Sequence, residues 1–219
     1  MKKLMLICAV ALAFVGCKSE KGEEPQVSYL TLVTYQGTDE TQGVSTFTFQ
    51  TIDDSPVITL TAAYKPSAEL KDGTRVMLDY YADNYNVSGP ITVRRISPVI
   101  GSTPTQTDAP NTGNIGISPT TVWRSGPYLN AYIEAYVTAD PVSVKFALDK
   151  STISDPVPVY YLALSVNNYR EVEAYRRIAT MSYDISDVWN LPTCKGVKVF
   201  YRDMADNTRS FEISKKPNN

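Results

Sequence analysis

The sequence VSVKFALD, at residues 142–149, decides the fold class because its side chains alternate in character. Val142, Val144, Phe146 and Leu148 are apolar, and the positions between them are mostly polar. A period of two is typical of a β-strand that buries one face and exposes the other. The stretch therefore predicts a strand of a β-sandwich.

Similar stretches lie on both sides of this one. Each is rich in β-branched and aromatic residues and is bounded by Gly, Pro, Asn or Asp. The predicted strands cover residues 129–137, 159–166, 179–185, 197–202 and 209–213. The last two form a hairpin across residues 203–207, which are turn formers. We therefore expect a β-sandwich domain over residues 115–214 and a short tail at 215–219.

The preceding part of the chain shows the same period of two. Its predicted strands are residues 27–36, a strand marked by Phe47 and Phe49, and residues 58–64, 75–82 and 91–96. The alternation slips at Arg94-Arg95, as it does at a β-bulge. Five short strands within residues 27–101 predict an OB-like barrel. The sequence thus predicts an all-β protein, with an N-terminal OB-like five-stranded barrel followed by a C-terminal β-sandwich.

The remaining segments are interpreted as connections. Residues 102–114 contain no large apolar side chain, which predicts an inter-domain linker or a long loop. In residues 168–177 apolar side chains recur every three positions, so this segment is either a helix or, as the flanking strands favour, a loop with one helical turn. A second short turn is expected at Ser186, whose hydroxyl can cap the backbone before Val188 and Trp189.

Residues 1–16 have the parts of a signal peptide. Two lysines precede an apolar run that is shorter than the roughly 20 residues needed to span a bilayer. Residues 14–17, FVGC, resemble a lipobox, where signal peptidase II cuts before a cysteine that carries diacylglycerol. Cleavage between Gly16 and Cys17 would make Cys17 a lipidated N-terminus, followed by a flexible tether over residues 17–26.

A lipidated Cys17 also predicts the compartment. We expect the protein to be lipid-anchored in the outer membrane of a Gram-negative envelope, either periplasmic or surface-exposed, with the lipid as its membrane contact. Cys8 leaves with the signal peptide and Cys17 is modified, so Cys194 has no cysteine to pair with. The fold is therefore expected to depend on its hydrophobic core.

The composition excludes several kinds of chemistry. The chain has 219 residues and no histidine, so it can build neither a Ser-His-Asp or Cys-His nucleophile nor a histidine zinc site. Its 21 Lys and Arg residues against 23 Asp and Glu residues give a formal net charge of -2, without the basic stretch that nucleic-acid binders show. We therefore expect no enzyme activity, no cofactor, no metal site and no nucleic-acid partner.

The aromatic residues suggest a ligand site of another kind. The chain has 15 tyrosines and 2 tryptophans, and aromatic rings can stack on sugars. The candidate ligand contacts are Tyr81, Tyr85, Tyr132 and Tyr136. The alternative is that the tyrosines complete the cores and keep their hydroxyls in water. Trp123 and Trp189 are interpreted as core anchors.

Paired carboxylates would be needed for a glycoside hydrolase. Such an enzyme holds two of them about 5 to 10 Å apart. The available acidic residues are Asp53, Asp54, Asp79, Asp83, Glu134, Glu171 and Glu173. The sequence brings no pair of them together, and Asp53-Asp54, which precedes Ser55-Pro56, is most simply a hairpin turn.

Several motifs resemble those of the NigD-like lipoproteins. They are the lipobox at Cys17 and residues 73–80 (GTRVMLDY), 122–130 (VWRSGPYLN) and 181–186 (MSYDIS). The resemblance implies an N-terminal OB-like domain and a C-terminal β-sandwich, with no enzyme activity and no established ligand. The association of the family with a bacteriocin locus suggests an immunity-type role. Residues 160–177 depart from the family pattern.

Three functional hypotheses follow. The first is a non-enzymatic envelope lipoprotein that binds a protein or glycan partner. The second is a bacteriocin immunity-type protein that intercepts a toxin at the membrane. The third is a carboxylate-dependent glycoside hydrolase.

Overall fold

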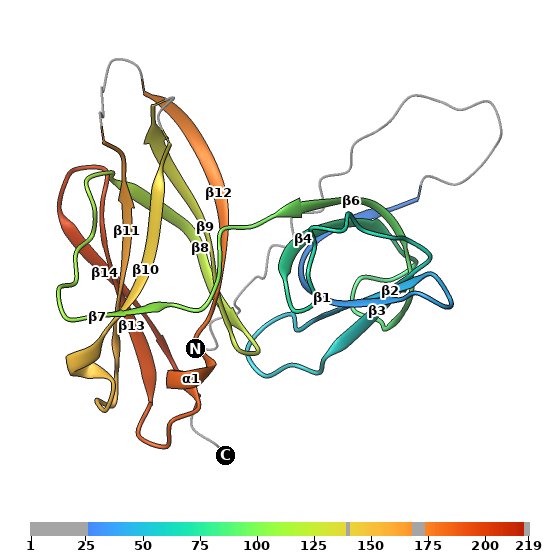
Figure 1. Ribbon diagram of the computed structural model, residues 1–219. Coiled ribbons are helices and arrows are strands. Elements are labelled where there is room, and N and C mark those ends of the chain that lie inside the picture. Colours follow the sequence, from blue (N-terminus) through green and yellow to red (C-terminus); the bar gives the residue numbers. More distant parts are fainter. Residues whose placement is uncertain (1–25, 139–140, 168–173, 217–219) are drawn as a thin grey trace, which may run out of the picture.

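Two β-structures lie side by side in the computed structural model, which describes residues 26–138, 141–167 and 174–216 (Figure 1). The predicted signal peptide, the lipidation site at Cys17 and the tether up to residue 25 lie outside the described residues. No helix in the described part of the chain is long and apolar enough to cross a membrane. The prediction of an all-β protein is confirmed.

The C-terminal domain is a sandwich of two sheets. The larger has the strand order β14-β13-β11-β10-β7 and the smaller β12-β9-β8. The strands are β7 (Thr105–Thr107), β8 (Ile117–Ser125), β9 (Tyr128–Val137), β10 (Ser143–Asp149), β11 (Val159–Ser165), β12 (Tyr175–Asp184), β13 (Gly196–Arg202) and β14 (Thr208–Ser214). A short 3₁₀ helix, η1 (Lys150–Thr152), follows β10.

Alternating side chains of both sheets form the sandwich core. Phe146 and Leu148 of β10 point inward and are buried. The Phe146 ring stacks on Tyr160 of β11 at 4.9 Å and on Tyr183 of the opposite sheet at 4.6 Å between ring centroids. Such contacts between sheets stabilise the pair through burial and through aromatic packing.

Residues 102–114 contribute a strand to this domain. β7 pairs in parallel with β10, from Ala147 opposite Thr105 to Asp149 opposite Thr107. β7 has no apolar side chain, so the hydrophobic pattern that identifies the other strands is missing from it. The segment is therefore not only a connection, because three of its residues extend the larger sheet.

The N-terminal domain is one curved sheet with the strand order β5-β3-β2-β1-β4-β6. Its strands are β1 (Ser28–Asp39), β2 (Val44–Phe49), β3 (Ile58–Ala62), β4 (Arg75–Tyr81), β5 (Gly89–Pro90) and β6 (Thr92–Pro98). The prediction here was an OB-like five-stranded barrel; the sheet has six strands, and its edge strands β5 and β6 are not paired with each other. The strand predicted at residues 91–96 is confirmed as β6, which pairs with β4 at one edge; the additional strand is β5, which precedes it and pairs with β3 at the opposite edge. Pro90 has no backbone N–H to continue the ladder, which ends there.

Two local predictions can be compared with the structure. The bulge is confirmed, because Asp79 pairs with Arg95 and Tyr80 with Val93, which leaves Arg94 as the extra residue. The short helix is confirmed as α1 (Ser186–Trp189). Its cap was predicted wrongly: Ile185 is the N-cap, and the backbone N–H of Ser186 donates to Asp184 instead. Residues 168–173 lie outside the described part of the chain, and β12 begins at Tyr175.

Candidate functional site

The three motifs of residues 73–80, 122–130 and 181–186 all contribute to the junction between the two domains. Backbone hydrogen bonds fasten it at two places. Asp53 donates to Arg124 and accepts from Gly126, both at 2.7 Å. Ile100 and Ser182 form the second bridge, in which Ser182 donates to Ile100 at 2.9 Å. Segments far apart in the sequence therefore meet at one place.

Arg124 extends from the C-terminal domain toward the N-terminal one and finds a carboxylate there. Its two terminal nitrogens donate to the two oxygens of Asp54 at 2.9 and 2.7 Å. One of them also donates to the carbonyl of Gly126 at 2.5 Å, and the guanidinium lies 4.5 Å from the ring centre of Trp189. Arg124 is only 4% exposed. Its hydrogen bonds hold the pKa of Asp54 below the usual value of 3.8.

Arg75 extends in the opposite direction and finds no such partner. Its Nε donates to the hydroxyl of Ser182 at 3.0 Å, and its terminal nitrogens approach the hydroxyls of Thr34 and Ser125 at 3.4 and 3.5 Å. The guanidinium lies 4.3 Å from the ring centre of Tyr128. Within the described ranges no carboxylate forms an ion pair with it. Burial lowers the pKa of Arg75 to about 10, so it stays charged at neutral pH.

Neutral groups support Arg75 from behind. Ser182 donates to Asn130 at 2.7 Å, and Asn130 donates to Ser125 at 2.9 Å. Asn130 is fully buried, on the face of the smaller sheet that meets the N-terminal domain. This network fixes the position of the Arg75 guanidinium without neutralising it.

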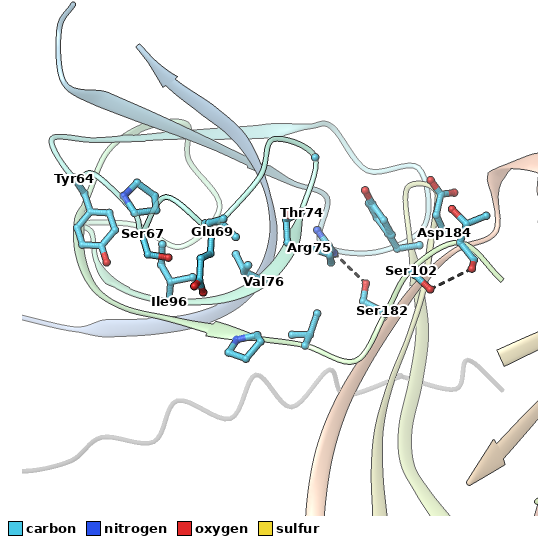
Figure 2. A pocket seen from close by; sticks show the side chains of 18 residues that line it. Tyr64, Ser67, Glu69, Thr74, Arg75, Val76, Ile96, Ser102, Ser182 and Asp184 are labelled. Carbon is cyan, nitrogen blue, oxygen red and sulfur yellow. Dashed lines mark hydrogen bonds between the residues drawn. The ribbon is translucent and has the colours of Figure 1, made fainter. Parts of the chain in front are cut away.

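A cleft of about 670 Å³ opens beside Arg75, between the two domains (Figure 2). Figure 2 shows Glu69 and Ser67 on the N-terminal wall, and Ser102 and Asp184 near the C-terminal domain. Hydroxyl groups are frequent in its lining, which includes Tyr64, Ser67, Thr74, Ser102, Thr103 and Ser182. A cavity of this volume falls in the range of small-molecule sites.

Gly101 lets the chain pass close to β12 at the edge of this cleft. A Cβ atom at this position would overlap the backbone carbonyl of Ser182. The close approach brings Ser102 and Thr103 to the cleft and is therefore open only to glycine.

The four tyrosines predicted as ligand contacts lie in different surroundings. Tyr81 is half-buried and lies beneath the guanidinium of Arg94, 5.0 Å from the ring centre. Tyr85 packs on Tyr29 and Phe49 at 5.4 and 5.9 Å, and thus belongs partly to the N-terminal core.

Tyr132 and Tyr136 both lie on the outward face of β9. Tyr132 packs against Trp123, 5.1 Å away, and burial raises its pKa with a smaller contribution from Tyr85 of the other domain. Tyr136 is 46% exposed. The structure therefore places Tyr85 and Tyr132 in the same region, and leaves Tyr81 and Tyr136 apart from them. None of the four lines the cleft beside Arg75.

Several acidic residues considered for a hydrolase are paired with cations. Asp54 is held by Arg124, Asp79 by Arg94 and Glu134 by Arg176. Hydrogen bonding from Arg176 lowers the pKa of Glu134, the reverse of what a general acid needs. Asp53 pairs with Lys216. Glu171 and Glu173 lie outside the described residues.

Metal ligands do not gather in the described part of the chain. No group of three or more His, Cys, Asp or Glu side chains converges among the residues that were placed. Cys194 is buried and donates to the carbonyl of Gly196 at 3.3 Å.

Sequence reasoning named the segments that carry Arg75 and Arg124 but gave neither arginine a role. The signal that could have found them is a charged residue within an otherwise apolar strand. Arg124 pairs with buried Leu129 on the neighbouring strand, and Arg75 directly precedes buried Val76 and Met77. An arginine at such a position needs partners that the local sequence does not supply.

The fold and the junction define a two-domain all-β protein with an inter-domain cleft. No model of a known protein family matches the sequence, and no curated protein matches it either. Solved structures do share the fold. A NigD-like immunity protein from Bacteroides caccae superposes with a TM-score of 0.60 at 17% identity, over 89% of this chain and 100% of that one.

Two further structures are similar. A putative lipoprotein from Bacteroides fragilis has a TM-score of 0.62 at 16% identity, over 89% of this chain and 100% of that one. A putative toxin-related protein from Parabacteroides distasonis has a TM-score of 0.64 at 14% identity, over 86% of this chain and 93% of that one. The chain therefore has the NigD-like fold.

Proposed function

We propose that this protein is a non-enzymatic binding lipoprotein of the cell envelope, which holds a protein or glycan partner. The observation that carries the proposal is the junction: two domains fastened to each other with an open cleft between them. A rigid scaffold with a preformed cleft is typical of a binding site. The paired carboxylates described above argue for binding rather than hydrolysis.

The anchor is the lipid at Cys17, in the outer membrane. The lipobox-like sequence supports this, as does the similarity in fold to a putative lipoprotein. Two or more acyl chains on one cysteine give stable anchoring, since each buried methylene contributes about 0.8 kcal/mol.

Metabolic labelling tests the anchor. Cells grown in radiolabelled palmitate should label the wild-type protein, and Cys17→Ala should abolish the label. Cys194→Ala is the matched control and should label like the wild type. An unlabelled wild-type protein, or a labelled Cys17→Ala variant, would contradict the anchor.

Binding itself is tested with the purified full-length chain on a glycan array and on outer-membrane proteins separated on a blot. We expect saturable binding to at least one ligand, and excess unlabelled protein should compete with this binding. Silence against both sets would overturn the proposal. Protease shaving of intact cells then distinguishes surface exposure, in which the protein is cleaved, from a periplasmic location, in which it is protected.

A second candidate is a bacteriocin immunity-type role, and one observation favours it. The fold is shared with a protein described as a NigD-like immunity protein. If the role holds here, deleting the gene should sensitise cells to a toxin encoded beside it. Unchanged sensitivity would remove this candidate and leave the binding proposal intact.

A further inference from the structure

No carboxylate among the placed residues forms an ion pair with Arg75, so its charge is not neutralised there. Buried charged groups in proteins are usually paired, because desolvation of an isolated ion is costly. The described partners of Arg75 are three hydroxyl groups and an aromatic ring. These orient the guanidinium but supply no negative charge.

The same side chain lines the cleft. Arg75 is half-buried, whereas Arg124 is buried, and Arg75 lies between the junction and the open space of the cleft (Figure 2). Its hydrogen bonds to the hydroxyls of Thr34, Ser125 and Ser182 fix it in place before any ligand arrives. A preorganised charge at the wall of a cavity binds an opposite charge at little entropic cost.

The rest of the lining describes what accompanies that charge. Ser67, Ser102 and Thr103 are exposed hydroxyls on both walls, and Tyr64 offers an aromatic surface. Hydroxyl groups and an aromatic ring match the polar edge and the apolar face of a sugar.

Two acidic side chains limit the charge of the ligand. Glu69 lies exposed on the N-terminal wall, and Asp184 lies on the opposite side, where it accepts from the backbone of Ser186. Both can accept hydrogen bonds from sugar hydroxyls. Both also repel a second anion, so the cleft suits a ligand with one negative group, placed at Arg75.

We propose that the cleft beside Arg75 binds a sugar unit that carries one carboxylate, of the hexuronate class, with the carboxylate on the Arg75 guanidinium. The planar fork of arginine matches the two oxygens of a carboxylate. This assignment rests on the proposed binding function, for which it names the ligand chemistry.

Three probes separate the parts of this assignment: galacturonate, galactose and acetate. Each is titrated into the purified full-length chain and followed by nuclear magnetic resonance or calorimetry. Galacturonate should bind, and galactose should bind at least tenfold more weakly, because it lacks the charge-assisted hydrogen bonds. Acetate should also bind at least tenfold more weakly, because it lacks the hydroxyls. Equal binding of galactose or of acetate, or no binding of galacturonate, would overturn the assignment.

Two variants test the role of Arg75. Arg75→Met keeps an unbranched apolar stem but removes the guanidinium and its charge, and should abolish galacturonate binding. Thr34→Asp introduces a carboxylate where Thr34 now accepts from Arg75, so it should occupy the guanidinium and also abolish binding. Arg209→Met, which removes an exposed arginine on the β13–β14 hairpin, is the control and should bind like the wild type.

The two substitutions protect the test against a failure to fold. If Arg75→Met is unfolded, Thr34→Asp, which keeps Arg75, decides the matter. Full galacturonate affinity in either folded variant would contradict the assignment. If galacturonate does not bind but palmitate labelling and partner binding persist, the assignment fails and the proposed function stands.

Discussion

Arg124 and Arg75 are reciprocal residues of the junction, and they differ in what receives them. Each extends from its own domain to the other. Arg124 donates two hydrogen bonds to the carboxylate of Asp54, whereas the described partners of Arg75 are hydroxyl groups and an aromatic ring. The charge of Arg124 is therefore balanced by a carboxylate, whereas that of Arg75 is not balanced by any described residue.

This difference separates a structural contact from a binding contact. A paired arginine on an aromatic ring holds two domains together and has little left to offer a ligand. An arginine oriented by neutral groups beside a cleft retains an unmatched charge for one.

The largest effect is expected at Arg124. Arg124→Met removes both hydrogen bonds to Asp54 and the contact with Trp189, so the free energy of unfolding should fall by about 2 kcal/mol. This is below the 3 to 5 kcal/mol typical of a fully buried pair, because Asp54 is solvent-exposed. Urea unfolding followed by tryptophan fluorescence measures it. A variant as stable as the wild type would show that the pair does not hold the junction.

A smaller effect on stability is expected at Arg75. Arg75→Met removes a desolvated charge that has no carboxylate partner, so the loss of three hydroxyl contacts is partly offset. The free energy of unfolding should change by less than about 1 kcal/mol. The same urea titration compares the two variants directly. If Arg75→Met destabilises the protein as much as Arg124→Met, the two sides of the junction are equivalent and the contrast fails.

The smallest effect depends on pH. The pKa of Asp54 is lower in the folded protein than its usual 3.8, so its ion pair stabilises the fold above that value. The stabilisation should decrease as the pH falls below 3.8 toward the pKa of the folded state and should vanish beneath it. Asp54→Asn lacks it at every pH. The difference in stability between the two proteins should therefore be constant at neutral pH and disappear in strong acid; a difference that persists there would have another cause.

The fold was largely predictable because alternation is a local signal. Val144, Phe146 and Leu148 identify a strand without reference to any other residue. The signal fails where it is absent or interrupted. β7 has no apolar residue to identify it, and β5, with only the two residues Gly89 and Pro90, is too short to show alternation.

The site could not be predicted in the same way. Arg75 and Ser182 are 107 positions apart, and Arg124 and Asp54 are 70 apart. The residues next to each arginine in the sequence do not determine its partners, because the partners come together only when the two domains meet. The four tyrosines were selected as exposed aromatic residues, and that criterion does not detect a charge without a partner.

A crystal structure of the full-length protein at saturating galacturonate tests the central claim most directly. The account predicts that the ligand carboxylate lies about 3 Å from the guanidinium nitrogens of Arg75, within hydrogen-bond distance, with Arg124 still bound to Asp54. A sugar bound elsewhere, with the Arg75 side of the cleft empty, would contradict it.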